Sequence, residues 1–305
     1  MKRVEIRDIV LMVGLMWLGL TTSCIRDELA PCPPLQISLE VTDKNYRNIR
    51  GASRLGLEEM RSETLPFKAY VHNLSYRLTS IDSGEEVLVR TLSPVEGEAG
   101  QIQLTLPDDL PYGRYLFSAW GNVTEQNKPA EEEMATELHP EGEAGADLYY
   151  TVDTLTYALG SEQYTCGMKR LKGKLIVEVK NLPDSYRYAY NSVSDIQTHW
   201  SWSEGYSHPE EMCFREAWTQ PGDQIYKRLM APSEAEAASV VKVHFTEQPE
   251  SADSGNWLAP EPVSVTLRRN ELTVLRYDYD RCCCCFKVYI LVNDNWETLH
   301  SMEID

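Results

Sequence analysis

Cysteine is the residue type in this 305-residue chain with the widest choice of chemistry, and the chain has eight of them. In a compartment that permits disulfides, isolated thiols are candidates for pairing. With Cys24 set aside for the reason given below, seven remain, so at least one thiol stays unpaired if every pair is intramolecular. The isolated candidates for a disulfide are Cys32, Cys166 and Cys213.

The other four thiols form the run Cys282, Cys283, Cys284 and Cys285, directly before the strand-like stretch Phe286–Val292. Successive side chains of a strand point to opposite faces of a sheet, so these thiols should not converge on one tetrahedral metal ion. The run also lacks the Cys-x-x-Cys spacing of structural zinc sites. We expect small buried or edge side chains here with one disulfide at most, a metal or redox role being the alternative.

Histidine offers general acid–base chemistry, but the six histidines are scattered and no motif surrounds them: His72, His139, His199, His208, His244 and His300. The sequence contains no HExxH, GxSxG or GxxxxGK[ST] motif, and no GxGxxG after a strand. Those motifs place metal ligands, nucleophiles or phosphate-binding amides at fixed geometry. We therefore expect no enzyme activity, no cofactor, no metal and no small-molecule substrate.

Aromatic side chains cluster at Trp200, Trp202 and Tyr206. Exposed rings of this kind stack on sugar rings, so the cluster is a candidate glycan-binding platform. Trp200 and Trp202 alternate along a predicted strand and would share one face. Packing in a core or an interface also suffices to explain the two tryptophans, and we favour the core.

The chain begins with the layout of an export signal: Lys2, Arg3 and Arg7 precede the short apolar run Ile9–Leu20. Twelve apolar residues are too few to span a bilayer as a helix, which takes about 20. Small residues follow, and then Cys24, in an arrangement that resembles a lipobox. We predict a signal peptide at residues 1–23 and acylation of Cys24, because two or more acyl chains hold a protein stably on a membrane.

Period-2 alternation of apolar residues dominates the rest of the chain and predicts an all-β protein, as at Leu35–Val41, Tyr115–Trp120 and Leu272–Tyr277. Short strands separated by turn-rich pieces are typical of antiparallel sandwiches. Length favours two of them in tandem, at residues 24–165 and 166–305. Helical spacing is limited to Leu57–Glu63 and Pro129–Leu138, and Glu125–Asp147 should be a mobile, exposed loop.

The formal net charge is −18 at pH 7. A nucleic-acid partner needs a basic footprint, and anionic lipid attracts basic segments, so neither is expected as a charge-driven partner. The acidic stretch Arg26-Asp27-Glu28 follows the predicted lipid site. It looks like the sorting signal of surface-exposed lipoproteins in Bacteroides-type bacteria.

Three stretches together resemble the fimbrillin-associated anchor proteins of type V pili. Cys24–Leu39 has a cysteine, an acidic pair, Cys32 before proline and then a strand, like the mature start of that family. Tyr115–Asn122 resembles its strand ending in Trp-Gly, and Met168–Val179 resembles its basic-then-alternating strand. The resemblance extends to about Val179, and the four-cysteine run is not a feature of the family.

The resemblance implies two transthyretin-like sandwiches at the base of a pilus, anchored in the outer membrane through Cys24 and partnered by a shaft subunit. In that assembly a shaft subunit loses its first strand by proteolysis and a neighbour's last strand fills the groove. The anchor keeps its own first strand, here Leu35–Val41, and limits fibre length. Arg47, Arg50, Arg54 and Arg61 follow it, where arginine-specific cleavage would remove it.

The resemblance also implies that the anchor donates a C-terminal strand, for which Trp296–Ile304 is the candidate. Alternation there would put Thr298, His300, Met302 and Ile304 on one face, after Trp296 at its start; an ordinary terminal strand is the alternative. A different function remains open for the whole chain, that of a surface glycan-binding lipoprotein of a polysaccharide-uptake system.

Overall fold

The computed structural model describes residues 33–129, 135–234, 238–249, 257–292 and 294–300. The chain divides into residues 1–33 and a compact unit, Pro34–Asp305, to which the following architecture belongs. Its helical segments are short: α2 (Ile49–Arg54), η1 (Phe67–Ala69), η2 (Glu125–Asn127) and η3 (Pro140–Gly142). The strands are β1 (Gln36–Val41), β2 (Leu74–Ser80), β3 (Glu86–Leu92), β4 (Gln101–Gln103), β5 (Gly113–Gly121), β6 (Thr136–Glu137), β7 (Tyr149–Tyr157), β8 (Gln163–Arg170), β9 (Gly173–Lys180), β10 (Tyr188–Ser201), β11 (Gly205–Ala217), β12 (Gln224–Met230), β13 (Ser239–Thr246), β14 (Trp257–Leu258), β15 (Val263–Val265), β16 (Leu272–Asp280), β17 (Cys285–Val292) and β18 (Asn295–His300).

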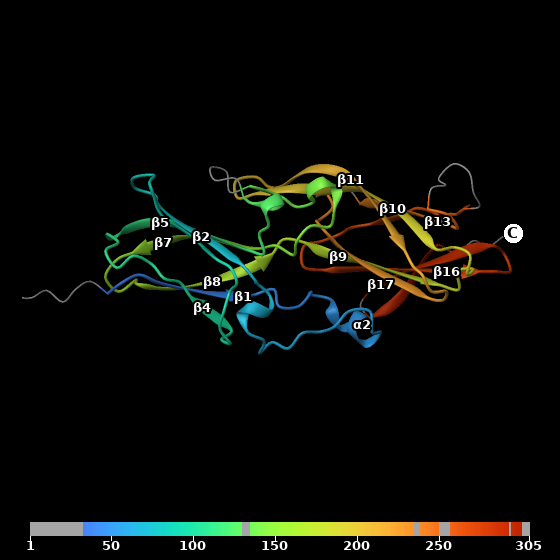
Figure 1. The fold of residues 1–305 in the computed structure, drawn as a ribbon, viewed down its shortest axis with the longest axis horizontal. Coiled ribbons are helices and arrows are strands. Elements are labelled where there is room, and N and C mark those ends of the chain that lie inside the picture. The colour runs from blue at the N-terminus through green and yellow to red at the C-terminus, as the bar shows by residue number, and fades with distance from the viewer. Residues whose placement is uncertain (1–32, 130–134, 235–237, 250–256, 293, 301–305) are drawn as a thin grey trace, which may run out of the picture. The chain divides into compact units, whose positions relative to one another are not determined.

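The strands before residue 171, apart from the short β6, form a seven-stranded arrangement in the order β3-β2-β5-β7-β8-β1-β4. β7 and β8 pair only at Tyr149–Arg170 and Tyr150–Lys169, so β3-β2-β5-β7 and β8-β1-β4 make two layers joined at one corner (Figure 1). One apolar cluster fills the space between the layers, with Ile37 and Leu39 from one and Tyr76 and Phe117 from the other.

The later strands form a second pair of sheets, one in the order β11-β10-β13-β14 with β15 and β6 attached, the other in the order β12-β9-β16-β17-β18. Their facing sides share a second apolar cluster, which includes Val177, Val193, Phe245 and Tyr277. Alternate residues of β9 and β16 face this core because side chains alternate across a strand. The expectation of an all-β sandwich fold is confirmed; the number of domains stays a prediction, and its 165/166 boundary would fall inside β8.

The outer face of the five-stranded sheet has its own small cover. Ile49, Ala52 and Leu57 pack there against Ile176 of β9 and Val274 of β16. Residues Leu57–Glu63, expected to be helical, are turns and irregular backbone, and the helix lies earlier, at α2. Six residues are too few for a helix to be stable alone, so α2 depends on this packing.

The expectation of an exposed loop at Glu125–Asp147 is wrong for residues 136–140, whereas Glu125, Gln126 and residues 141–143 are exposed as expected. Thr136 of β6 pairs with Trp200 of β10, and Leu138 and His139 are buried. This stretch has few apolar residues, but Leu138 is fully buried. The imidazole of His139 bonds to the backbone of Glu143 through one ring nitrogen and to that of Ala231 through the other. The predicted helix Pro129–Leu138 falls partly outside the described residues, and its last residues belong to β6.

Candidate functional site

The first strand, β1, lies in the middle of its layer. It pairs in parallel with β8 along its whole length, from Gln36–Gln163 to Val41–Met168, and antiparallel with β4 on the other side. Leu35, Ile37, Leu39 and Val41 are each at most 3% exposed. The stretch predicted to be a retained strand is therefore an integral part of the core.

The energy involved is large. Full burial of a leucine, isoleucine or valine side chain contributes ~1.5–3 kcal/mol, so these four side chains, Leu35 directly before β1 and three within it, contribute ~6–12 kcal/mol before any cost in entropy. A whole domain is stable by about 5–15 kcal/mol. Loss of β1 would therefore open an apolar groove between β8 and β4 that the fold could not leave empty.

The segment after β1 is bonded to strands far along the chain. Asp43 Oδ2 accepts from the backbone N–H of Arg170 at 2.9 Å and also pairs with Arg269. The N–H of Arg47 donates to the carbonyl of Asn270 at 2.9 Å. These bonds tie the exit of β1 to the turn before β16.

Asn48 continues this attachment by bonding to both backbone groups of one residue of β16. Its Nδ2 donates to the Leu272 carbonyl at 2.7 Å, and its Oδ1 accepts from the Leu272 N–H at 2.8 Å. Further on, Glu58 pairs with Lys174 at 2.7 Å and with Lys227 at 3.1 Å. We call residues 43–58 the clasp. The sequence analysis treated residues 43–58 as a loop between strands and did not predict the clasp. The Asn48 side-chain amide bonds to the backbone of Leu272 as a neighbouring strand would, and such a contact leaves no periodic pattern in the sequence.

The four arginines that follow β1 lie in or beside the clasp. Arg47 pairs with Glu271 at 3.7 Å and Arg54 with Asp294 at 3.0 Å, although both side chains are more than half exposed. Arg50 is on the exposed side of α2. Arg61 donates to the Ala69 carbonyl at 3.1 Å. Their side chains are open to solvent, while the backbone between them is held by the packing of α2.

The last described strand, β18, is at the edge of the five-stranded sheet and pairs only with β17. The guanidinium carbon of Arg276 lies 3.8 Å from the ring centre of Trp296, and Thr298 is exposed. A register shift between Val288 and Tyr289 turns Leu299 toward the core. Of the candidate donor residues, Met302, Ile304 and the side chain of His300 lie outside the described part of the chain.

The aromatic cluster separates into interior and surface rings. Trp200 is 4% exposed and packs 5.3 Å from Trp120 and 4.3 Å from Tyr150, centre to centre. The Tyr206 hydroxyl donates to the Leu171 carbonyl at 2.6 Å, and burial raises its pKa. Trp202 follows the end of β10 and is 49% exposed. The three rings do not share a face, so they form no common stacking platform.

Two of the three cysteines suggested for a disulfide lie in described strands. Cys166 is buried in β8 and Cys213 is exposed on β11, both as free thiols. Burial raises the Cys166 pKa to about 12. Cys24 and Cys32 lie outside the described residues.

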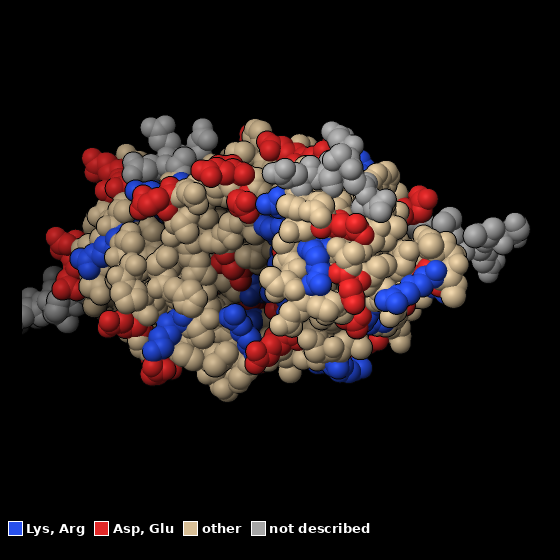
Figure 2. All heavy atoms as spheres, turned by 45° about the vertical axis from the view of Figure 1, so that its right-hand side comes forward, with Lys and Arg blue, Asp and Glu red and all other residues tan. Residues whose placement is uncertain are grey.

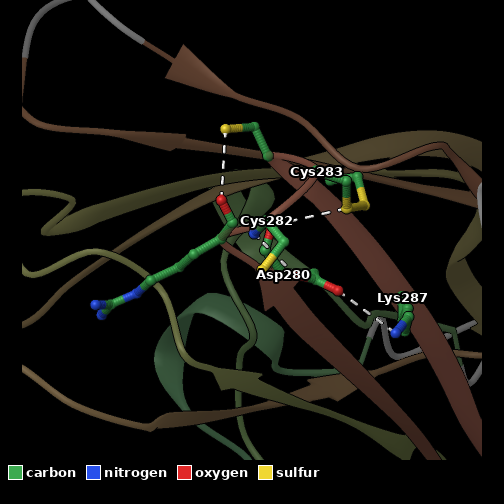
Figure 3. Close-up of a disulfide and its surroundings, with 7 residues drawn as sticks. Asp280, Cys282, Cys283 and Lys287 are labelled. Carbon is green, nitrogen blue, oxygen red and sulfur yellow. Dashed lines mark hydrogen bonds and ion pairs between the residues drawn. A yellow bond between two sulfur atoms is a disulfide. The ribbon is translucent and has the colours of Figure 1, made fainter.

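The four-cysteine run forms the hairpin between β16 and β17 rather than a strand (Figure 3). Its thiols therefore do not alternate across a sheet, because only Cys285 belongs to a strand. Cys283 and Cys285 form a disulfide, with Cα atoms 5.2 Å apart. Cys282 donates its N–H to Asp280 at 2.9 Å, and Cys282 and Cys284 are free and exposed.

A buried polar group lies where β8 passes into β9. Arg170, 3% exposed, donates to Asp147 at 3.0 Å and to Asn270 Oδ1 at 2.8 Å. Lys172 is fully buried, and its ammonium donates to the Ala144 carbonyl at 2.6 Å. Burial lowers the Lys172 pKa to about 7 and, with Lys172 nearby, the His139 pKa to about 3. These side chains join backbone segments that lie far apart in the sequence.

The described ranges hold no group of three or more His, Cys, Asp or Glu side chains able to bind a metal ion. Nor do they contain a helix long and apolar enough to cross a membrane. On the face in Figure 2, acidic and basic side chains are interspersed rather than gathered by sign.

Comparison with known proteins identifies relatives of the fold. The sequence matches no protein-family model and no curated protein sequence. Among solved structures, a candidate adhesin of Bacteroides ovatus matches with a TM-score of 0.59 at 13% identity, covering 92% of this chain and 98% of that one. The fimbrial anchor protein Mfa2 of Porphyromonas gingivalis matches with a TM-score of 0.55 at 15% identity, covering 88% and 100%. A candidate polysaccharide-binding protein of Bacteroides thetaiotaomicron matches with a TM-score of 0.52 at 12% identity, covering 87% and 98%. At such identities the likeness establishes the β-sandwich fold.

Proposed function

We propose that this chain is the anchor subunit of a type V pilus. It is a lipoprotein that holds the fibre in the outer membrane and limits its length by β-strand complementation, and it catalyses no reaction. The observation that carries the proposal is the position of β1, a buried central strand with three core side chains. A subunit whose groove is already filled by its own strand cannot accept one from a neighbour, so growth stops there.

The clasp supports this role. Asp43, Arg47 and Asn48 bond to residues 170 and 269–272, so removing β1 would also detach these contacts. A shaft subunit that must lose its first strand gains nothing from such an attachment. An anchor that must keep it does. Likeness of the fold to the anchor Mfa2 is consistent with this assignment.

The membrane attachment belongs to the same proposal. Cys24 lies ten residues before Pro34, where the compact unit begins. Acylation there would hold β1 close to the bilayer, and the outer membrane is the location implied by an exported lipoprotein of a fibre. No charge-driven docking on lipid is needed.

The N-terminus of the protein in its native host tests the assignment. Mass spectrometry of the membrane fraction should find a chain that begins at acylated Cys24, and Cys24→Ser should release it, while Cys32→Ser should not. A mature chain that begins after Arg47, Arg50, Arg54 or Arg61 would make it a shaft-like subunit instead. Deleting the gene should lengthen the fibres and shed them into the medium.

The second half of the proposal concerns the partner, the first shaft subunit, to which the C-terminal segment would be donated. β18 is an edge strand with one neighbour, so it can leave its sheet at lower cost than an inner strand. Deleting residues 297–305 should shed fibres but leave the lipoprotein in the membrane. A double variant, Met302→Asp with Ile304→Asp, should do the same, whereas Met302→Leu with Ile304→Val should not. Fibres retained by the aspartate variant would exclude this segment as the donor.

Glycan uptake is the second candidate function, favoured by the exposed ring of Trp202 and by the likeness to the Bacteroides thetaiotaomicron structure. Burial of Trp200 leaves this cluster without a platform. Trp202→Ala should therefore leave polysaccharide binding unchanged in affinity electrophoresis. Loss of binding in that variant would revive the candidate.

A further inference from the structure

Four sulfur atoms lie together in the hairpin tip between β16 and β17, two of them bonded to each other and two of them free. Asp280 and Cys285 are the last register pair of the hairpin, so Cys282, Cys283 and Cys284 lie in its loop (Figure 3). Cys283 is joined to Cys285, whereas Cys282 and Cys284 are free thiols. A disulfide and thiols, the two reactants of thiol–disulfide exchange, therefore occur within four consecutive residues. We call residues 282–285 the cysteine tip.

The two sulfur atoms of this disulfide differ in their access to solvent. Cys283 is exposed in the loop, whereas Cys285 is 5% exposed and begins β17. The next residue, Phe286, packs in the core against the ring of Phe245, 5.4 Å away centre to centre. Since Cys285 is held by its strand and Cys283 is open to solvent, an incoming group reaches the bond at Cys283.

The fold has little need of this disulfide. A disulfide stabilises a protein more when it closes a longer loop, and this one joins residues only two positions apart. The hairpin is already closed by the register pairs between β16 and β17, from Leu275–Ile290 to Asp280–Cys285. Opening the bond should therefore leave the hairpin in place, as expected of a bond that reacts rather than one that supports the fold.

The backbone at Cys284 also favours a role for its thiol. Its φ is +53°, in the left-handed region. Glycine is the usual residue there, because a Cβ atom crowds the neighbouring carbonyl oxygen. Residues held in such a conformation cluster at functional sites. What cysteine adds over glycine at this position is an exposed thiol.

Basic side chains flank the cysteine tip. Arg281 precedes it and is exposed, and no ion pair to Arg281 occurs in the described part of the chain. The carboxylate of Asp280 accepts from the Cys282 N–H at 2.9 Å and pairs with Lys287 at 3.6 Å, so its own charge is largely balanced (Figure 3). The Arg281 guanidinium attracts an incoming thiolate, which is the reactive form of a thiol and carries a negative charge.

We propose that the cysteine tip is a thiol-exchange site, which takes up an external thiol as a mixed disulfide. The incoming thiolate attacks the Cys283 sulfur and forms a new sulfur–sulfur bond. The bond to Cys285 breaks, its electron pair leaves with the Cys285 sulfur, and that thiolate takes up a proton from water. One disulfide replaces another, so no oxidant or reductant is consumed.

Two sources supply such a thiol: a small molecule in solution, and Cys282 or Cys284 of a second copy of this chain. The tip lies at the opposite end of β16 from Leu272, to which the clasp is bonded. A nine-residue strand is about 26 Å long, so exchange at the tip should leave the attachment of β1 intact. The exchange chemistry does not depend on the anchoring role.

Reduced glutathione is the probe, added in the absence of oxygen to the full chain purified without reductant. After alkylation of the remaining thiols, peptide mass spectrometry should find glutathione on Cys283 and a newly alkylated Cys285. Cys283→Ser with Cys285→Ser removes the disulfide and should lower the uptake of glutathione about tenfold. Cys213→Ser is the matched control, because it removes an exposed free thiol from β11, and it should change nothing.

Arg281→Gln tests the flanking charge. It should slow the uptake of glutathione, an anionic thiol, by about threefold at low salt, and high salt should remove the difference. Non-reducing electrophoresis without glutathione distinguishes the two sources of thiol. A dimer joined through Cys283 would identify a second copy as a source, whereas a chain that takes up glutathione and stays monomeric would restrict the ligand to small thiols. Both results support the exchange site.

Glutathione found on Cys166 or Cys213 instead of Cys283 would overturn the proposal. So would a chain whose four tip cysteines are all alkylated before glutathione is added, since no disulfide would then be present to exchange. An intact disulfide that takes up no glutathione would do the same. The unsubstituted chain decides these outcomes even where a variant fails to fold. A chain acylated at Cys24 that takes up no glutathione would separate this failure from that of the anchor assignment.

Discussion

The first and last described strands of the compact unit are held in opposite ways. β1 has a strand on each side, three buried side chains and the clasp behind it. β18 has one neighbour among the described strands and a bulged register, and none of the side chains of residues 295–299 is fully buried. The two strands are of equal length, so the difference lies in their positions in the sheets.

This contrast matches what the two ends of a fibre base would need. Detaching a strand that closes the groove should require a large free energy. Detaching a strand that is donated to a partner should require a small one. The free energy of local opening differs between parts of a protein, and the elements that move are those that open at a low free energy. Four measurements test whether β1 and β18 are held as differently as the structure indicates.

The largest expected effect comes from one leucine in each strand. Leu39→Ala in β1 should lower the free energy of unfolding by about 2–5 kcal/mol, because it leaves a cavity in the core. Leu299→Ala in β18 should cost ~1 kcal/mol, because Leu299 is only half-buried. Urea denaturation of both variants gives the two values. Equal costs would mean that the strands are not held differently.

Alkaline pH should stabilise the fold through the connection between β8 and β9, where Lys172 is buried with a pKa of about 7. Between that value and about 10.4, the pKa of an unfolded lysine, the unfolded state binds more protons. The unfolding free energy should therefore rise with pH, by at most about 1.4 kcal/mol per unit. Denaturation at pH values between 7 and 9.5 should show this slope, and Lys172→Met should flatten it. The exposed Lys242→Met is the control, and a slope unchanged by Lys172→Met would refute the assignment.

A smaller effect is expected from the clasp. Asn48→Ala removes two hydrogen bonds to Leu272, at about 0.5–1.5 kcal/mol each, so the loss should be ~1–3 kcal/mol. Limited proteolysis with trypsin should then cut faster among Arg47, Arg50 and Arg54. Arg50→Ala, on the exposed side of α2, controls for changes in the helix itself. Unaltered cleavage in Asn48→Ala would show that the clasp does not protect this segment.

The smallest effect should be confined to β18. Trp296→Ala removes the contact with the Arg276 guanidinium, which is worth ~0.5–1 kcal/mol. Amide hydrogen exchange should become faster in β18, while that of β1 stays the same. Faster exchange in β1 as well would mean that the two strands unfold as one unit.

Much of the fold could be predicted from apolar alternation, since one face of each inner strand is buried. Leu35–Val41 and Leu272–Tyr277 lie in β1 and β16 nearly as expected. The edge strand β11 was missed because Pro209, Glu210 and Glu211 face solvent and hide its period, leaving Met212 as its buried residue. Such polar residues protect an edge from pairing with other chains.

The site was less predictable than the fold. The importance of β1 followed from alternation and from its place after Cys24, but the clasp depends on bonds between residues more than 200 positions apart, such as Asn48 and Leu272. In β18, alternation alone could not reveal that Leu299 faces the core, because a bulge changes the register there. Long-range amide contacts and bulges are set by tertiary structure and leave little trace in local sequence.

The parallel pairing of β1 with β8 has a mechanical consequence. Pulling on Pro34 along the strand direction loads the ladder bonds from Gln36 to Val41 together in shear, because they run across the pull. Bonds loaded together must break together, whereas a strand peeled from its end gives way one bond at a time. The compact unit should therefore resist a pulling force applied at Pro34 far better than its equilibrium free energy of unfolding alone would suggest.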